Sequence, residues 1–189
     1  MSIKIYVDQG HNPRDFNTGA EGNGFYEQDI TYKVGKLLFD LLRSDQRFEP
    51  ILSRPNPNTT LGVSNSSSLT ARVNQANASG ADLFLSLHTN ASTNENANGS
   101  EALIYSNDSE VARGVAEDIL EQMTRITGLR NRGIVERPGL YVLKRTRMPA
   151  VLVEMGFITN PAEAELMAYS PELFAEGIYR GLVEYYFDR

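Results

Sequence analysis

The chain has 189 residues and a formal net charge of −6, with two histidines and neither cysteine nor tryptophan. The absence of cysteine excludes disulfides, thiolate zinc sites, iron–sulfur clusters and a cysteine nucleophile. An acidic chain without a long basic run is poorly suited to nucleic acid, and no apolar run of about 18 residues is present to span a membrane. For this length we expect one domain over residues 1–189 and, by default, a monomer.

The pattern of apolar residues predicts alternating strands and helices along the chain. Strands are expected over residues 3–8, 48–53, 82–88, 100–105 (at an edge of the sheet), 140–143 and 150–153. Helices are expected over residues 27–43, from Ser67 or Ser68 to Ser79, from Val111 to near Gly128, after Asn160-Pro161, and from Pro171 to Phe187.

This alternation predicts an α/β fold, with a twisted and mostly parallel sheet of about six strands flanked by helices on both faces. The run 82–88 is apolar throughout, which is typical of a strand buried on both faces of a parallel sheet. Ligands of such sheets bind beyond the carboxyl ends of the strands. Functional residues are therefore expected just after the predicted strands.

Three chemically versatile side chains occupy those positions. His11 follows the first strand, His88 ends the strand 82–88, and Glu154 ends the last apolar strand. Two imidazoles and a carboxylate suit zinc, and a further carboxylate that is not a ligand could serve as general base. On chemistry alone the third ligand could be Glu21, Glu27 or Glu154.

The residues alone leave a plainer interpretation open. Histidines at strand ends are commonly structural, and the sequence has no HExxH or CxxC spacing. Glu154 could instead form an ion pair with Arg145 or Arg147, and Glu27 could be an acid favoured by the dipole at a helix start. A metal hydrolase and an ordinary polar sheet edge are both compatible with these residues.

Six motifs taken together carry more information than any of them alone. They are I-Y-V-D-Q-G-H-N at 5–12, G-F-Y-E-Q-D-I at 24–30, L-T-A-R-V-N-Q-A-N at 69–77, A-D-L-F-L-S-L-H-T-N-A at 81–91, L-Y-V-L at 140–143 and M-P-A-V-L-V-E-M-G-F-I-T-N at 148–160. In this order they resemble the zinc-dependent N-acetylmuramoyl-L-alanine amidases of the Amidase_3 type over nearly the whole chain.

The resemblance implies roles for particular residues. It implies that His11, Glu27 and His88 hold Zn²⁺ at the carboxyl ends of the strands, and that Glu154 is the catalytic carboxylate. The implied substrate is peptidoglycan, cut at the amide between the lactyl group of N-acetylmuramic acid and L-alanine of the stem peptide. Arg132 and Leu140 lie where the family borders its peptide groove, and they are candidate substrate contacts.

One further residue is a candidate for the site, and three positions depart from the family motifs. Arg72 is a third candidate substrate contact, or a partner for a carboxylate of the site. Gln9, Asn12 and Thr89 replace residues common in the family motifs, and these departures affect substrate positioning rather than the ligands.

Two rival functions are a wall-binding module without turnover and another zinc hydrolase, such as a carboxypeptidase or deacetylase. A carboxypeptidase would need a cation for the terminal carboxylate of its substrate. Because peptidoglycan lies outside the cytoplasm, we expect action at the cell wall. The N-terminus has no signal peptide, so we expect an excised catalytic domain or a phage lysin.

Overall fold

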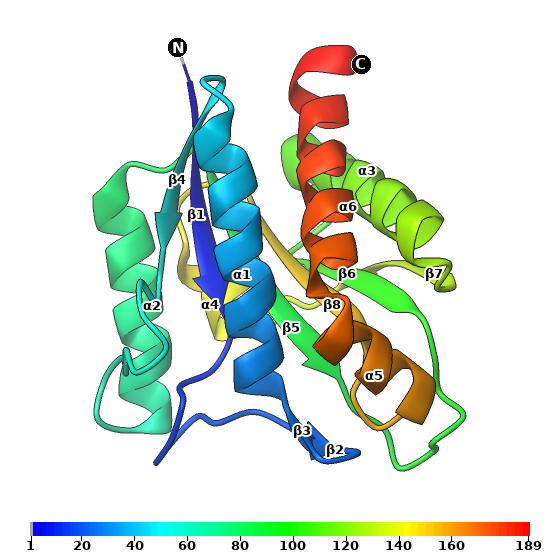
Figure 1. Ribbon diagram of the computed structural model, residues 1–189. Helices are drawn as coiled ribbons and strands as arrows, with labels where there is room; N and C mark the ends of the chain where they lie inside the picture. The colour runs from blue at the N-terminus through cyan, green and yellow to red at the C-terminus, as the bar shows by residue number, and fades with distance from the viewer. Residues whose placement is uncertain (1) are drawn as a thin grey trace.

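The computed structural model describes residues 2–189 and contains a six-stranded sheet with helices on both faces (Figure 1). The sheet strands are β1 (Ile3–Gln9), β4 (Phe48–Leu52), β5 (Leu83–Asn90), β6 (Ser100–Ile104), β7 (Asn131–Glu136) and β8 (Ala150–Phe157). A separate hairpin contains β2 (Glu21–Gly22) and β3 (Phe25–Tyr26). The helices are α1 (Glu27–Ser44), α2 (Asn65–Ser79), α3 (Glu110–Thr127), α4 (Tyr141–Arg145), α5 (Pro161–Tyr169) and α6 (Pro171–Val183). The predicted α/β fold is confirmed.

The strand order brings three strand ends to one edge of the sheet. The order is β4-β1-β5-β8-β6-β7, and the first four strands run parallel to one another. β6 runs antiparallel to β8, and β7 runs parallel to β6. The carboxyl ends of β1, β5 and β8 therefore meet where β6 begins.

Two apolar layers bury the sheet. Every second residue along the strands, such as Val7, Leu85 and Leu87, points to the face covered by α1, α3 and α6, which lie in front of the sheet in Figure 1. The intervening residues face α2 and α4, and here Tyr6 and Phe84 stack with ring centroids 5.9 Å apart. Burial on both faces explains why β5 is apolar nearly throughout.

Two predictions about strands were wrong. Residues 140–143 belong to α4 and its N-cap rather than to a strand. Val142 and Leu143 both pack into the α2 layer, whereas adjacent residues of a strand would point to opposite faces. β6 is not an edge strand, because β7 pairs with it on its outer side. β7 escaped prediction because it begins Asn131-Arg132-Gly133, which has little strand propensity.

The helix boundaries also differ in two places. Ser64, not Ser67 or Ser68, caps α2, and Ser67 completes the reciprocal capping box as its third residue. The last α-helix ends at Val183, and a π-helical turn (Glu184–Asp188) follows. Among residues 2–189, the structure has no helix whose length and apolar character would let it cross a bilayer.

Close packing of α6 on α3 depends on small residues. A Cβ added at Gly181 would collide with the backbone of Ile119, which cannot move as a flexible side chain could. We predict that Gly181→Ala lowers the free energy of unfolding by about 1–2 kcal/mol, because overpacking exceeds the gain of about 1 kcal/mol in helix propensity. Denaturant unfolding measures the change. Gly139→Ala is the control, since its Cβ meets nothing within 4 Å, and an equal loss there would contradict the prediction.

Candidate metal centre and catalytic carboxylate

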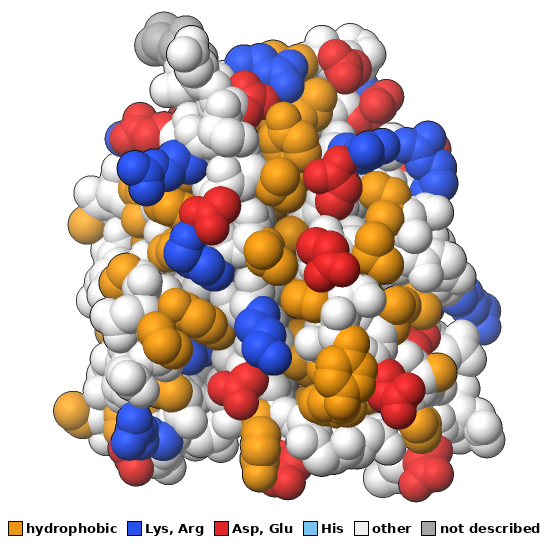
Figure 2. Space-filling view, in the orientation of Figure 1, with side chains coloured by type: hydrophobic (Ala, Val, Ile, Leu, Met, Phe, Trp, Pro, Cys, Tyr) orange, Lys and Arg blue, Asp and Glu red, His pale blue; other side chains and the backbone are white. Residues whose placement is uncertain are grey.

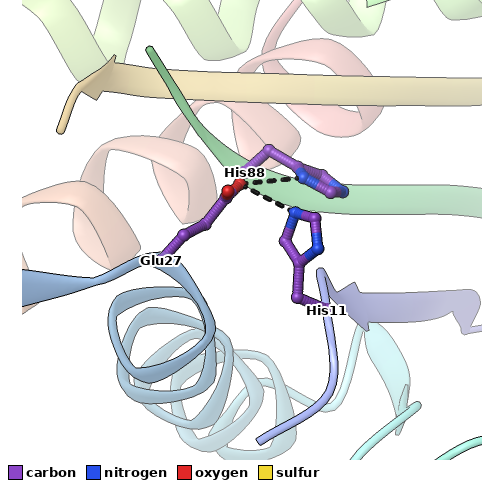
Figure 3. Close-up of side chains that lie close together, drawn as sticks. All are labelled: His11, Glu27 and His88. Atoms are coloured by element: carbon purple, nitrogen blue, oxygen red, sulfur yellow. Dashed lines mark hydrogen bonds and ion pairs between the residues drawn. The ribbon is translucent and has the colours of Figure 1, made fainter. Parts of the chain in front are cut away.

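The carboxyl ends of β1 and β5 and the start of α1 bring together His11, Glu27 and His88 (Figure 3). His11 lies two residues beyond β1, His88 lies within β5, and Glu27 is the first residue of α1. Each side chain offers one ligand atom, and these atoms lie within 4.8 Å of one another. Of the three carboxylates left open by the sequence, the structure brings Glu27 into this cluster, whereas Glu21 lies exposed on the hairpin.

The Glu27 carboxylate lies between the two imidazoles. Its Oε1 lies 3.1 Å from Nε2 of His11 and 3.0 Å from Nδ1 of His88. The same oxygen accepts a hydrogen bond of 2.9 Å from the backbone N–H of Thr89, and Oε2 accepts one of 2.8 Å from Ala20. The backbone thus fixes the carboxylate, while its oxygen faces both histidines.

Two glycines allow the cluster to close. A Cβ at Gly10 would lie 2.6 Å from Cε1 of His88, and one at Gly19 would lie 2.8 Å from both the His11 ring and Oε2 of Glu27. Gly19 also has a φ of 82°, and His11 itself has a φ of 69°. The loop after β1 therefore bends through left-handed conformations, which glycine adopts at little cost.

Electrostatics favour an ionised Glu27. Burial raises the pKa of this carboxyl, but hydrogen bonds and charge interactions with His11 and His88 outweigh burial and bring the pKa well below its usual range. An anionic carboxylate beside two imidazoles is an arrangement suited to a divalent cation.

Glu154 is a second carboxylate at this edge, on β8. In the sheet register it lies opposite His88 of β5 on one side and Glu101 of β6 on the other. Its Oε2 is buried and has no hydrogen-bond partner among residues 2–189. Burial, followed by the charges of Glu27 and Glu101, raises its pKa to about 8. A carboxyl with a pKa near neutrality is suited to proton transfer.

Behind the cluster, a buried ion pair joins β1 to α2. The Arg72 guanidinium donates from Nη1 to Oδ1 of Asp8 at 2.5 Å and from Nη2 to the backbone carbonyl of His11 at 2.5 Å. Ser86 donates to the other Asp8 oxygen at 2.8 Å. Arg72 is only 1% exposed. Its guanidinium is therefore committed to holding the His11 loop.

A pocket of about 120 Å³ opens beside the two histidines. Its further walls are Asp8, Gly10, Asn17, Leu69, Arg72, Leu140, Tyr141, Val142 and Leu152. Leu140 thus lines the pocket beside the two histidines. Arg132 does not line this pocket, because it pairs with Glu101 at 3.2 Å and lies over the ring of Phe157.

Sequence reasoning missed several residues that support the cluster. Asn17 contacts the His11 ring, Asp8 anchors Arg72, and Glu101 faces Glu154. Asp8 carried a signal, because an acid at the end of an otherwise apolar strand needs a buried partner. Asn17 and Glu101 carried none, since their contacts depend on the path of a loop and on an unexpected strand order.

The chain is similar to known cell-wall enzymes. Residues 5–184 match the Amidase_3 family model, described as N-acetylmuramoyl-L-alanine amidase. N-acetylmuramoyl-L-alanine amidase LytC of Bacillus subtilis is 37% identical over 186 residues, which are 96% of this chain and 35% of LytC. The germination-specific N-acetylmuramoyl-L-alanine amidase of B. subtilis is 30% identical over 195 residues, covering 98% of this chain and 80% of that protein.

A solved structure gives the same result for the fold. The N-acetylmuramoyl-L-alanine amidase from Clostridium difficile 630 superposes with a TM-score of 0.87 at 28% identity, covering 97% of this chain and 96% of that one. This chain spans about a third of LytC and nearly all of the C. difficile structure. The sequence, the fold and the site geometry agree: the chain belongs to the Amidase_3 family of N-acetylmuramoyl-L-alanine amidases, a family of hydrolases.

Proposed function

We propose that this chain hydrolyses the amide between the lactyl group of N-acetylmuramic acid and L-alanine in peptidoglycan, and that it depends on one zinc ion. The observation that carries the proposal is the convergence of two imidazoles and one carboxylate near Glu154, whose Oε2 is buried and has no hydrogen-bond partner among the described residues. We further propose that residues 1–189 form a single catalytic domain that acts on the cell wall.

The donor set fits zinc. Two imidazole nitrogens and one carboxylate oxygen are the protein ligands of many catalytic zinc sites, which keep a further position open. Gly10 and Gly19 place no side chain over the cluster, where any Cβ would strike the histidine rings. His11, Glu27 and His88 would hold the ion. When bound, zinc at such a site supplies Lewis acidity, which lowers the pKa of water and polarises a carbonyl.

The residues of the chain then divide the work. Glu154 accepts a proton from the attacking water at Oε2 and returns it to the alanine nitrogen as the amide bond breaks. Burial and the neighbouring carboxylates raise the pKa of Glu154 to about 8, so the positive charge of a bound cation would be needed to lower that pKa and ionise Glu154 as the base. Leu140 offers an apolar wall to the substrate, whereas Arg132 lies outside this pocket and is paired with Glu101, so no contact in the structure supports its assignment to the substrate.

We assign Arg72 to positioning. Its buried guanidinium holds Asp8 and the carbonyl of His11, so it would act on the substrate through the His11 loop. This observation also weakens the carboxypeptidase alternative. Both Nη atoms of Arg72 are engaged by Asp8 and by the loop that carries His11, and Arg132 is paired with Glu101, so a terminal carboxylate would have to displace existing partners of either cation. A wall-binding module without turnover would not need the buried and unpaired Oε2 of Glu154.

The first test is the chemistry of the products. We expect the zinc-loaded protein to release stem peptides that begin with L-alanine from purified peptidoglycan, because only cleavage of the lactyl amide frees that terminus. A chelator should abolish release, and added zinc should restore it. Mass spectrometry of the soluble fraction identifies the products. Peptides shortened at their C-terminus would instead indicate a carboxypeptidase.

Glu154→Gln tests the general base. The substitution keeps the shape of the side chain but removes the proton acceptor, so turnover should fall by about 10²–10⁴-fold while zinc content is retained. Product release and elemental analysis measure the two effects. Glu165→Gln, on the exposed face of α5, is the control and should keep full activity. Wild-type turnover by Glu154→Gln would remove Glu154 from this role.

His88→Ala tests the ligand set. The variant loses one of the two imidazoles that face Glu27, so both zinc content and activity should fall sharply. Elemental analysis after dialysis measures the zinc, and circular dichroism checks that the fold persists. A folded variant that still holds one equivalent of zinc would place the metal elsewhere.

A further inference from the structure

Asn17 contacts the side of the His11 ring that faces away from Glu27. It lies in the loop after β1, has a φ of 54°, and its Oδ1 is 3.2 Å from Nδ1 of His11. The other ring nitrogen, Nε2, lies 3.1 Å from Oε1 of Glu27. The two nitrogens of one imidazole thus meet acceptors on opposite sides, and Figure 3 shows the ring with one edge directed at Glu27.

Hydrogen bonds hold the Asn17 side chain and backbone on the side away from His11. Its Nδ2 donates to Oγ of Ser68 at 3.0 Å, and its backbone N–H donates to Oδ1 of Asn65 at 2.7 Å. Asn12 also donates to Ser68 Oγ, at 3.2 Å, and backbone groups of Leu61 hold both ends of the Asn12 amide. With its nitrogen on Ser68, Asn17 presents an oxygen to His11.

We propose that Asn17 is a positioning residue for the metal site: its side-chain oxygen accepts the Nδ1–H of His11 and so directs the Nε2 lone pair of that ring to zinc. This inference rests on the proposed zinc site. An imidazole ligand that donates its second N–H is fixed in tautomer and orientation, and it is a stronger base. The loop from Asn12 to Asn17 and the start of α2 thereby contribute to metal affinity without touching the ion.

The geometry also assigns opposite tautomers to the two histidines. His88 faces Glu27 with Nδ1 at 3.0 Å, whereas His11 faces it with Nε2. If the nitrogens that face Glu27 held zinc, the remaining N–H would be on Nδ1 of His11 and on Nε2 of His88. Since these are the only two histidines of the chain, ¹⁵N spectra of the histidine rings resolve both without crowding.

Three variants separate the side-chain oxygen from the backbone of the loop. Asn17→Gly removes the acceptor, and glycine tolerates the left-handed φ of this position. Asn17→Asp keeps an oxygen toward His11, and the Ser68 hydroxyl can rotate to donate to the other oxygen. Asn23→Gly is the matched control, because Asn23 also has a φ of 54°, and its amide holds a neighbouring loop to Ile158 without touching a ligand.

Zinc affinity, measured by competition with a chromophoric chelator, is the main readout. We expect Asn17→Gly to weaken zinc binding about 10–100-fold, and Asn17→Asp and Asn23→Gly to bind as tightly as the unmodified chain or, for Asn17→Asp, more tightly. In the ¹⁵N spectra of the unmodified zinc-loaded chain, we expect a protected N–H on Nδ1 of His11, which exchanges faster in Asn17→Gly.

Several outcomes would overturn the inference. Unchanged zinc affinity in Asn17→Gly would remove Asn17 from this role, and so would an equal loss in Asn23→Gly or in Asn17→Asp. A His11 ring protonated on Nε2 in the unmodified zinc-loaded chain would do the same without any variant. If the unmodified chain bound no zinc, the proposed metal site would fail first, and this inference with it.

Discussion

The cluster of His11, Glu27 and His88 at the edge of the sheet depends on one buried carboxylate. Glu27 is 3% exposed, and an ionised carboxylate in that position would be strongly destabilising without partners. It receives backbone N–H groups from Ala20 and Thr89 and faces both histidines, and it begins α1, where the helix dipole favours an anion. Glu27 belongs to α1, and its partners come from the loop after β1 and from β5, so those three segments must be correctly placed before the site can form.

A second buried interaction, the Arg72–Asp8 ion pair, positions the loop that faces the Glu27 carboxylate. The Arg72 guanidinium ties α2 to the end of β1, and burial of the Asp8 carboxylate is offset by its hydrogen bonds to Arg72 and Ser86. The charge of Arg72 keeps the pKa of Asp8 below its usual range, although burial acts in the opposite direction. Breaking such a pair leaves one buried charge uncompensated, which typically costs about 3–5 kcal/mol. The left-handed turn at His11 is therefore held at its backbone carbonyl by Arg72, which is paired with Asp8, and at its ring by Glu27.

The sequence allowed much of this arrangement to be predicted, for identifiable reasons. β5 and β8 are apolar over most of their length, and β1 is rich in β-branched and aromatic residues. The rule that ligands gather at the carboxyl ends of parallel strands then directed attention to His11, His88 and Glu154. The choice of Glu27 over Glu21 could not come from periodicity. Glu21 lies on the hairpin just before α1 and Glu27 begins α1, and the path of the hairpin decides which of the two carboxylates reaches the histidines. The resemblance to a family supplied that choice. The helix at Tyr141–Arg145 and the edge strand β7 were missed because short elements are decided by tertiary packing rather than by local propensity.

The reversed direction of β6 has a consequence for how the family can diversify. β5 ends and β6 begins at the same edge, so the connection between them, residues 91–99, lies at the edge that carries Glu154. It contains neither Glu154 nor any of His11, Glu27 and His88. Surface connections of this kind accept insertions and deletions with little effect on the core. New substrate preferences can therefore arise by lengthening or shortening one loop, while selection leaves the chemistry of the strand ends unchanged. The chain connectivity thus places a loop that can change in length beside the strand ends that carry the site residues.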